Sequence, residues 1–272
     1  MLESIGKPII IATYPRSGTH LTIDLLRKQF QECKSWKFLG ETKNNLYLDI
    51  DPILMSPPLS ERDRKLALHC LSRSQRPLVK THGSIPWLQS YNGWVEELVN
   101  GSDIFYVFRD GRKSLCSLHV FMKNYDPAAR CSISEFVRQE VNGVSRPRIW
   151  ANHVLNWIDR PNVRALKFED IIKNPRQAIT DIGQILGLTP LYVEPILPTS
   201  VKSRWQGLLA TFTQTQPEST NHTPEEKPAK WTEEWTYEDR KFFHEQAGDL
   251  LIRLGYESSD RWTREDNCHS KP

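Results

Sequence analysis

Short apolar runs alternate with amphipathic stretches along this chain, and the first such pair predicts a strand, a turn and a helix. Residues 7–13 are apolar and rich in β-branched side chains, which is typical of a buried strand. Behind a turn at 14–18, apolar residues recur at three- and four-residue spacing, so that they share one face of a helix: Leu21, Leu25, Leu26 and Phe30.

The same alternation returns three more times. Apolar runs at 78–80, 103–108 and 163–168 predict further strands, and helical stretches follow the last two. Asn174 and Pro175 predict a helix start, with Asn as the cap and Pro at the first helical position. The stretch 236–239 resembles a capping box and predicts a long terminal helix that Gly255 closes.

Alternating strands and helices favour the α/β class, with a central, mostly parallel sheet that is covered by helices on both faces. We find neither an internal repeat nor a domain boundary, and expect one domain over residues 1–272. Residues 191–231 are rich in Pro, Thr, Gln and Glu without periodicity, which predicts a long loop or lid inside this domain. Ligands in such sheets bind at the carboxyl ends of the strands.

The composition of the chain narrows the classes of protein to which it can belong. Of 272 residues, 38% are hydrophobic and 25% charged, the balance of a soluble globular protein. The apolar run 8–12 is far shorter than the ~20 residues that span a bilayer, and no signal peptide is evident, so we expect a cytoplasmic protein without a membrane partner. Five scattered cysteines without a C-x-x-C pair indicate neither a disulfide framework nor a zinc site. A net charge of +3 does not favour a nucleic-acid partner, but permits a local basic pocket for a small anion.

The loop 14–20 is the first candidate for that pocket. Its Ser17, Gly18 and Thr19 present successive backbone N–H groups at a predicted helix N-terminus, and Arg16 adds a fixed positive charge. The pattern is related to the P-loop but does not satisfy G-x-x-x-x-G-K-[ST]. An ordinary tight turn capped by Ser or Thr is the alternative interpretation.

The stretch 13–19, Thr-Tyr-Pro-Arg-Ser-Gly-Thr, resembles the 5′-phosphosulfate loop of sulfotransferases that use 3′-phosphoadenosine 5′-phosphosulfate (PAPS). In the cytosolic branch of this family the loop reads T-Y-P-K-S-G-T, so Arg16 replaces a lysine that assists the leaving phosphate. The resemblance implies that Arg16, Ser17, Gly18, Thr19 and His20 bind the donor PAPS and the product PAP. Arg cannot give up a proton, but a purely electrostatic role survives the exchange.

The stretch 106–117 resembles the family's 3′-phosphate segment, in which an Arg at a strand end and a Ser in the following helix bind one phosphate. Arg109 and Ser117 keep the family's spacing. An ion pair of Arg109 with Asp110 and a solvated Ser117 are the alternative interpretation. Val163 to Asp170 resembles the strand that ends in Y-E-D, with Phe168 in place of Tyr, which implies that adenine stacks there without the phenol's hydrogen bond.

Lys80, Thr81 and His82 resemble the family's K-T-H segment, which implies that His82 is the general base and that Lys80 neutralises charge on the sulfuryl group. Glu41 is a rival base, because some branches carry a catalytic glutamate after the first helix. A structural His82 and a solvated Glu41 are the alternatives. His119 is expected to support the site or to pack in the core.

The family's C-terminal signature, R-K-G-x-x-G-D-W-K, is degraded here to Lys-Pro-Ala-Lys-Trp at 227–231. Lys230 is our candidate for completing the 3′-phosphate site, with Lys227, Lys202 and Arg204 as alternatives that spacing does not separate. Aromatic residues that could line an acceptor pocket are Trp36, Phe38, Trp87, Trp94, Phe121, Tyr125 and Trp205. The resemblance covers residues 7 to 256.

The resemblance implies in-line transfer of a sulfuryl group to a hydroxyl or to an amine or carbamoyl nitrogen of a small molecule, without a metal. A bacterial secondary metabolite such as a guanidinium alkaloid is one expected acceptor. Two other interpretations stay open. One is an ATP-dependent, kinase-like transferase, which requires Mg²⁺ and a full Walker A lysine. The other is a non-catalytic nucleotide-binding protein. The sequence does not indicate an oligomeric state.

Overall fold

The computed structural model describes residues 5–36, 46–55, 60–91, 93–195 and 227–264. Contacts among them cluster into two compact units. The first unit comprises residues up to Thr13, Gly18–Phe108 and the chain from Trp157 to Thr223; the second comprises Tyr14–Ser17, Arg109–Asn156 and the chain from Pro224 onward. One domain over the whole chain stays a prediction.

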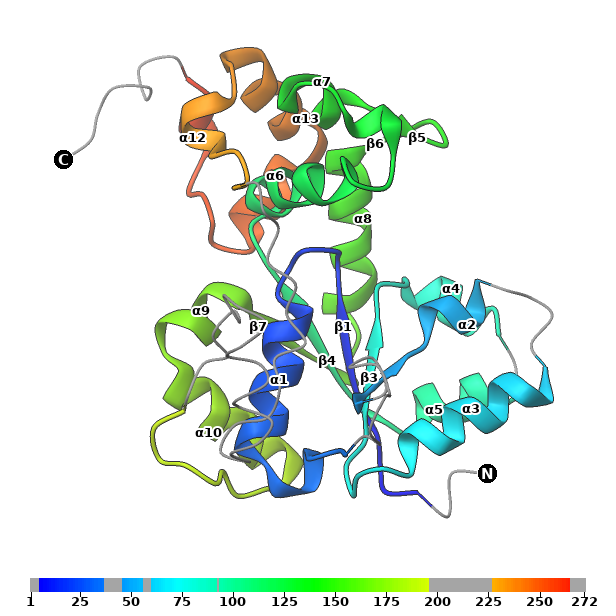
Figure 1. Cartoon of the computed structure of the whole chain (residues 1–272). Coiled ribbons are helices and arrows are strands. Elements are labelled where there is room, and N and C mark those ends of the chain that lie inside the picture. Colours follow the sequence, from blue (N-terminus) through cyan, green and yellow to red (C-terminus); the bar gives the residue numbers. More distant parts are fainter. Residues whose placement is uncertain (1–4, 37–45, 56–59, 92, 196–226, 265–272) are drawn as a thin grey trace, which may run out of the picture. The chain divides into compact units, whose positions relative to one another are not determined.

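The first unit is built on a parallel sheet. Its described strands are β1 (Ile9–Thr13), β2 (Leu48–Asp49), β3 (Leu78–Thr81), β4 (Asp103–Phe108) and β7 (Val163–Lys167), in the order β2-β3-β1-β4-β7. Each neighbouring pair is parallel, with Ile9 opposite both Leu78 and Asp103 (Figure 1). The strands predicted at 7–13, 78–80, 103–108 and 163–168 are confirmed. All five residues of β1 are buried, as is typical of a parallel strand covered on both faces, whereas β7 at the end of the strand order is only partly buried.

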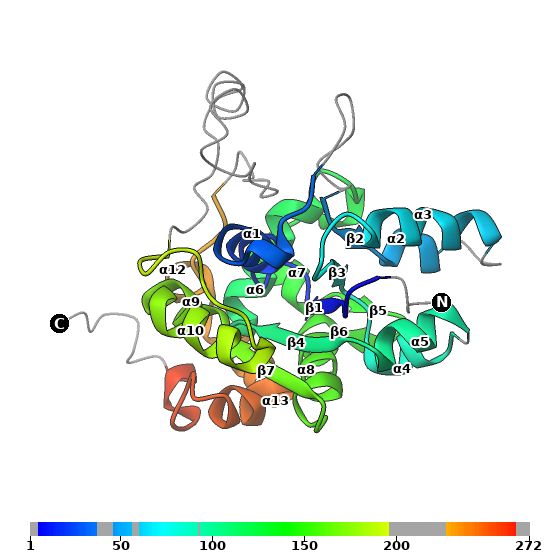
Figure 2. The same cartoon turned by 90° about the horizontal axis from the view of Figure 1, so that it is seen from below.

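The helices of this unit are α1 (Thr19–Gln29), α2 (Asp51–Leu54), α3 (Glu61–Leu71), α4 (Ile85–Gln89), α5 (Trp94–Asn100), α9 (Phe168–Lys173) and α10 (Pro175–Leu186), with the 3-10 turn η2 (Gln31–Cys33). Residues of α1, α9 and α10 share one core with alternate residues of β1 and β4, so these three helices cover one face of the sheet (Figure 2). On the other face, Tyr106 of β4 stacks on Trp157 with ring centroids 5.7 Å apart. Helical residues therefore pack on both faces, and the predicted α/β class is confirmed.

The amphipathic face predicted for the first helix is the one that packs on the sheet. Leu25, Leu26 and Phe30 are fully buried, and Leu21 packs against the same core. Burying each such side chain contributes about 1.5–3 kcal/mol relative to exposing it. For α10 the predicted start is correct, with Asn174 at the N-cap and Pro175 following, but the Asn174 side chain makes no capping hydrogen bond. Pro, rather than the Asn side chain, accounts for this start.

The second unit is mainly helical. Its elements are α6 (Gly111–Met122), η4 (Pro127–Ala129), α7 (Ile133–Arg138), the antiparallel pair β5 (Glu140–Val141) and β6 (Val144–Ser145), α12 (Trp231–Glu234), α13 (Tyr237–Arg253) and η5 (Asp260–Thr263). Helix α8 (Arg146–Ile158) begins in this unit, and its last residues belong to the first.

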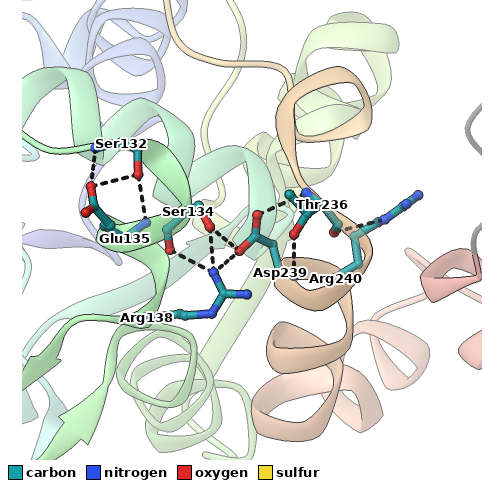
Figure 3. A network of polar contacts seen from close by, with 7 residues as sticks. All are labelled: Ser132, Ser134, Glu135, Arg138, Thr236, Asp239 and Arg240. Atoms are coloured by element: carbon teal, nitrogen blue, oxygen red, sulfur yellow. Dashed lines mark hydrogen bonds and ion pairs between the residues drawn. The ribbon is translucent and has the colours of Figure 1, made fainter.

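A buried carboxylate joins α7 to α13 in this unit. Asp239 is fully buried and forms the predicted capping box with Thr236 at the start of α13. It also accepts a hydrogen bond from Ser134 Oγ at 2.6 Å and an ion-pair contact from Arg138 (Figure 3). The predicted end of α13 is confirmed as well, because Gly255 adopts a left-handed φ of 70° just after it. Of the loop predicted at 191–231, the part 196–226 lies outside the described residues, and α12 begins at Trp231.

Candidate active site

The predicted phosphate loop connects β1 to α1. Where the loop joins α1, the helix N-terminus has the features of an anion site. Gly18 occupies the N-cap of α1 with a left-handed φ of 105°, and the first turn of the helix contains no acidic residue. Because glycine has no side chain, Gly18 makes no side-chain capping hydrogen bond to the first turn of the helix. Uncapped N–H groups and the positive end of the helix dipole attract anions.

Thr13, at the end of β1, connects this loop to the predicted general base. Thr13 and Thr19 are buried, and their hydroxyl oxygens lie 2.5 Å apart. Nδ1 of His82, just after β3, lies 2.9 Å from the carbonyl oxygen of Thr13 and 3.1 Å from its hydroxyl. All three residues belong to the first unit, so the structure brings the predicted base next to the end of β1.

The contact with Thr13 determines the tautomer of His82. A backbone carbonyl can only accept, so Nδ1 must carry the proton that it donates to Thr13 O. In the neutral imidazole, Nε2 is then the basic nitrogen. This is the arrangement that a general base needs: one nitrogen holds the ring in place while the other accepts a proton.

His82 faces a pocket of about 430 Å³ in the first unit. Its lining residues are Asp49, Asp51, Pro52, Met55, Lys80, His82, Gly83 and Trp87. The volume falls within the range of small-molecule sites, and its mixture of apolar walls with a few polar groups is typical of them. Among the described members of the aromatic set named above, Trp87 lines this pocket.

Lys80, predicted to neutralise the sulfuryl group, forms an ion pair with Asp49, in which Nζ and Oδ2 lie 2.6 Å apart. The side chains are mostly buried, which strengthens the pair relative to a surface one. An ammonium group has three donors, so Lys80 can keep this contact and still donate to a bound anion.

Asp51, at the start of α2, accepts two hydrogen bonds from the K-T-H segment. Its Oδ1 accepts from Thr81 Oγ1 at 2.6 Å, and its Oδ2 accepts from the backbone N–H of His82 at 2.7 Å. Burial raises the pKa of Asp51, and these two hydrogen bonds lower it by a smaller amount.

In the second unit the loop residue Arg16 meets the predicted 3′-phosphate pair. Arg16 Nε–H donates to Ser117 Oγ at 3.2 Å, and Arg109 Nη1–H donates to the carbonyl oxygen of Arg16 at 3.1 Å. The guanidinium of Arg16 also lies 5.3 Å from the ring centroid of Phe121. Motifs that are about ninety residues apart in the sequence therefore meet at one place.

Arg16 has a left-handed φ of 66°, a conformation that is uncommon outside glycine. Such residues concentrate at functional sites, where neighbouring contacts hold them. Burial, together with the nearby charge of Arg109, lowers the pKa of Arg16, although an arginine stays protonated. The neighbouring Ser17 is fully buried, and its hydroxyl lies 3.2 Å from that of Ser114.

The remaining predicted residues lie in different settings. Phe168 is the first residue of α9 and packs, half-buried, against the core. The His20 ring contacts Tyr47 edge to face, at 6.0 Å between centroids. Lys230 is the N-cap residue of α12, and its exposed Nζ pairs with Glu233 at 3.0 Å. His119 is buried against Phe136 and close to the carbonyl of Cys131, as expected for a packing role. Glu41, Phe38, Lys202, Arg204 and Trp205 lie outside the described residues.

The residues that sequence reasoning missed are Thr13, Asp49, Asp51 and Ser114. Asp49 ends the strand β2 and Asp51 begins α2, and a strand of two residues is too short to give a periodic signal. The sequence does contain one local signal for them, an Asp-x-Asp pattern at 49–51 in which one residue separates two carboxylates.

The fold and this geometry define an α/β protein with a glycine-capped loop and helix N-terminus after the first strand and a basic histidine after a neighbouring one. The sequence model of the sulfotransferase domain family matches residues 7–255. The chain belongs to this sulfotransferase family.

Individual relatives are distant. The chain is 25% identical over 189 residues to sulfotransferase 1B1 of the dog, Canis lupus familiaris, a match that covers 65% of this chain and 58% of the dog protein, less than two thirds of its length. A retinol dehydratase solved with androsterone and inactive cofactor PAP superposes with a TM-score of 0.54 at 18% identity, over 90% of this chain and 80% of that one. Mouse sulfotransferase SULT7A1, solved with PAP, superposes with a TM-score of 0.53 at 17% identity, over 97% of this chain and 91% of the mouse chain. These structures show the shared fold.

Within the described ranges, no helix combines the length and the apolar character that crossing a bilayer requires. The same residues contain no group of three or more His, Cys, Asp or Glu side chains that could hold a metal ion.

Proposed function

We propose that this chain transfers a sulfuryl group from PAPS to a small-molecule acceptor. The observation that carries the proposal is the meeting of Arg16, Arg109 and Ser117, because two arginines and a hydroxyl form a donor set for phosphate. Membership of the sulfotransferase family and the PAP bound by its structural relatives support this choice of nucleotide.

The residues of the chain have separate roles in this proposal. PAPS supplies the activated sulfuryl group. Arg109 and Ser117 bind the 3′-phosphate, with Lys230 as the candidate from the C-terminal segment. Arg16 and the N–H groups of Ser17, Gly18, Thr19 and His20 bind the 5′ end, and Phe168 contacts the adenine. Charge develops on the bridging oxygen during transfer, and Arg16 and Lys80 stabilise it.

His82 accepts the proton of the attacking hydroxyl or nitrogen at Nε2. The support is its fixed tautomer and its place in the wall of the pocket. Glu41 is the rival base. Reaction by in-line displacement depends on positioning and electrostatics, so the chain needs no covalent intermediate.

The pocket next to His82 is the proposed acceptor site. Pro52, Met55 and Trp87 suit an apolar or flat body, and the carboxylates of Asp49 and Asp51 suit a positively charged group. The acceptor is therefore a small, partly apolar molecule with an amine or guanidinium group near its nucleophile. A guanidinium alkaloid is one member of this class. Transfer assays with radiolabelled PAPS on matched neutral phenols and aminoalkylphenols, whose alkylammonium group is charged at neutral pH, test it, and equal KM values for the two sets would contradict the charge preference.

Calorimetric titration with PAP, 5′-AMP and ATP tests the donor. We expect a Kd on the order of 1–10 µM for PAP, and at least tenfold weaker binding of 5′-AMP because the 3′-phosphate contacts are lost. The Arg109→Ala variant is expected to lose about 10–100-fold for PAP and little for 5′-AMP. Equal binding of ATP and PAP would overturn the proposal in favour of ATP-dependent transfer. PAP binding without transfer to any acceptor would favour a non-catalytic nucleotide-binding protein.

A further inference from the structure

The turn that carries His82 is held by a residue that the family motif does not contain. Thr81 and His82 donate to the two carboxylate oxygens of Asp51, at 2.6 Å and 2.7 Å. One carboxylate therefore fixes both a side chain and the backbone of this turn. Because Asp51 begins α2, its own position is set by a helix rather than by a loose loop.

The next peptide of the turn is fixed as well. The hydroxyl of Thr81 accepts a hydrogen bond from the backbone N–H of Gly83 at 2.9 Å, and Trp157 Nε1–H donates to the carbonyl oxygen of Gly83 at 3.1 Å. A Cβ at position 83 would lie 2.2 Å from the Trp87 ring, so the turn has no room to shift in that direction. Asp51 and Trp157 thus hold the turn at two successive residues.

The orientation of the imidazole follows from the position of this backbone. Nδ1 of His82 reaches Thr13 O at 2.9 Å only while the turn keeps its place beside the end of β1. If the backbone N–H of His82 loses Asp51 as its acceptor, the turn is no longer held in place. The ring then loses the contact with Thr13 O that selects the Nδ1–H tautomer. We propose that Asp51 is a positioning residue, which holds His82 in the orientation in which Nδ1 donates to Thr13 and Nε2 is the basic nitrogen.

This inference rests on the proposed function, because it concerns the base of that reaction. Asp51 also lines the acceptor pocket, where its charge is expected to attract a cationic acceptor. The two roles differ in what they require. Positioning needs the hydrogen bonds, whereas attraction needs the charge.

Two substitutions separate these requirements. In Asp51→Asn, the amide oxygen can accept from the His82 N–H and the amide nitrogen can donate to Thr81 Oγ1, so both contacts survive without the charge. Asp51→Ala removes both contacts. Asp63→Ala is the matched control, because Asp63 forms a capping box at the start of α3, and its removal costs stability elsewhere in the first unit.

The first measurement needs neither donor nor acceptor. Long-range ¹H–¹⁵N correlation spectra of protein labelled at histidine, with the His82→Ala variant to assign the signal, report the tautomer of His82. We expect the Nδ1–H form in the wild type, Asp51→Asn and Asp63→Ala, and a mixture of tautomers in Asp51→Ala. A wild-type spectrum in Asp51→Ala would overturn the proposal. If that variant does not fold, Thr81→Val replaces it, because it removes the hydroxyl that joins Asp51 to Gly83.

Steady-state kinetics then connect the orientation of His82 to turnover. The acceptor is the one that the assays on phenols and aminoalkylphenols identify. Asp51→Ala is expected to lower kcat on the order of 10–100-fold, the cost of a misplaced catalytic group, with the Kd for PAP unchanged. Asp51→Asn is expected to keep kcat within about threefold and to raise KM for a cationic acceptor. An equal loss of kcat in Asp63→Ala would mean that lost stability is the cause, and would contradict the proposal. Loss of the 3′-phosphate preference in PAP titrations would overturn the sulfotransferase proposal alone, because the spectra test the His82 orientation independently.

Discussion

The Phe168 ring occupies the space in which Gly18 would carry a side chain: a Cβ at position 18 would lie 2.2 Å from Phe168 Cδ2. Gly18 also has a φ of 105°, which L-residues with a side chain rarely adopt. The phosphate loop therefore requires glycine for two independent reasons, the backbone conformation and the close approach of an aromatic ring.

Gly18→Ala is expected to distort the loop, to lower stability by at least about 1–3 kcal/mol, and to weaken PAP binding. Urea unfolding and calorimetric titration measure the two effects. The double variant Gly18→Ala/Phe168→Ala removes the clash but keeps the backbone strain, so it should recover only part of the stability, after allowance for the loss in Phe168→Ala alone. Full recovery would show that the backbone conformation contributes nothing.

His82→Ala is expected to lower kcat by about 10² or more, the usual cost of losing a general base. Its Kd for PAP should stay within about twofold, because the proposal assigns the phosphates of the nucleotide to Arg16, Arg109 and Ser117. Stopped assays with labelled PAPS measure kcat, and Glu41→Gln is the comparison. Near-wild-type turnover in His82→Ala, with a large loss in Glu41→Gln, would assign the base to Glu41.

Arg112 is a buried cation on which the second unit depends. It forms ion pairs with Asp110 and Glu257, and its guanidinium lies 3.9 Å from the Trp231 ring centroid and 4.6 Å from that of Trp262. Arg112→Ala leaves the Asp110 carboxylate buried without its partner, so we expect a loss of about 3–5 kcal/mol. Urea unfolding tests this against Arg148→Ala, an exposed arginine in α8, which should change stability by about 0.5 kcal/mol or less. A small effect of Arg112→Ala would show that water or another cation replaces the guanidinium.

Asp51 and Asp63 should contribute to pH dependence with opposite signs. Burial raises the pKa of Asp51, whose charged neighbours are Asp49 and Lys80 and which accepts hydrogen bonds from Thr81 and the His82 N–H, so its folded pKa lies above the unfolded one. Its contribution to stability is present below the unfolded pKa and is lost as pH rises through the folded pKa. Hydrogen bonds from Ser60 lower the pKa of Asp63, so its contribution is present above the unfolded pKa and is lost as pH falls through the folded pKa.

The measurement is Tm against pH from about 3 to 7, a range that brackets the usual pKa of Asp, for the wild type, Asp51→Asn and Asp63→Asn. Relative to the wild type, Asp51→Asn should gain stability toward neutral pH, and Asp63→Asn should lose it. Parallel curves for the two variants would contradict the assignment.

How far the sequence predicts this protein depends on the range of the interactions involved. The strands β1 and β4 were predictable because each is a local run of mostly buried apolar residues, and β3 and β7 are weaker local signals because polar residues interrupt them. Gly18 and Arg16 were predictable because the loop that holds them is contiguous. The capping box at Thr236 is likewise a signal within four residues.

Contacts between distant segments were not predictable in this way. Asp51 approaches Thr81 and His82 only because β2 pairs with β3, and β2 has two residues. Trp157 reaches Gly83 from the end of a helix that is 74 residues further along the chain. No local pattern marks either side chain, although both hold the turn that carries the predicted base. Asn174 is a further example of the limits of local patterns. Its residue type suits an N-cap, but its side chain makes no capping hydrogen bond.

The contact between Arg16 and Arg109 affects how the protein should be handled. The Arg109 guanidinium donates to the backbone carbonyl of Arg16, and its charge repels the Arg16 guanidinium, a repulsion that burial intensifies. An anion bound there cancels it, so the folded protein should be more stable in phosphate or sulfate than in chloride at equal ionic strength. At a ligand concentration one hundred times its Kd the gain is about 2.7 kcal/mol. The composition of the storage buffer therefore becomes part of the stability of this protein, and melting temperatures taken in different buffers are not comparable.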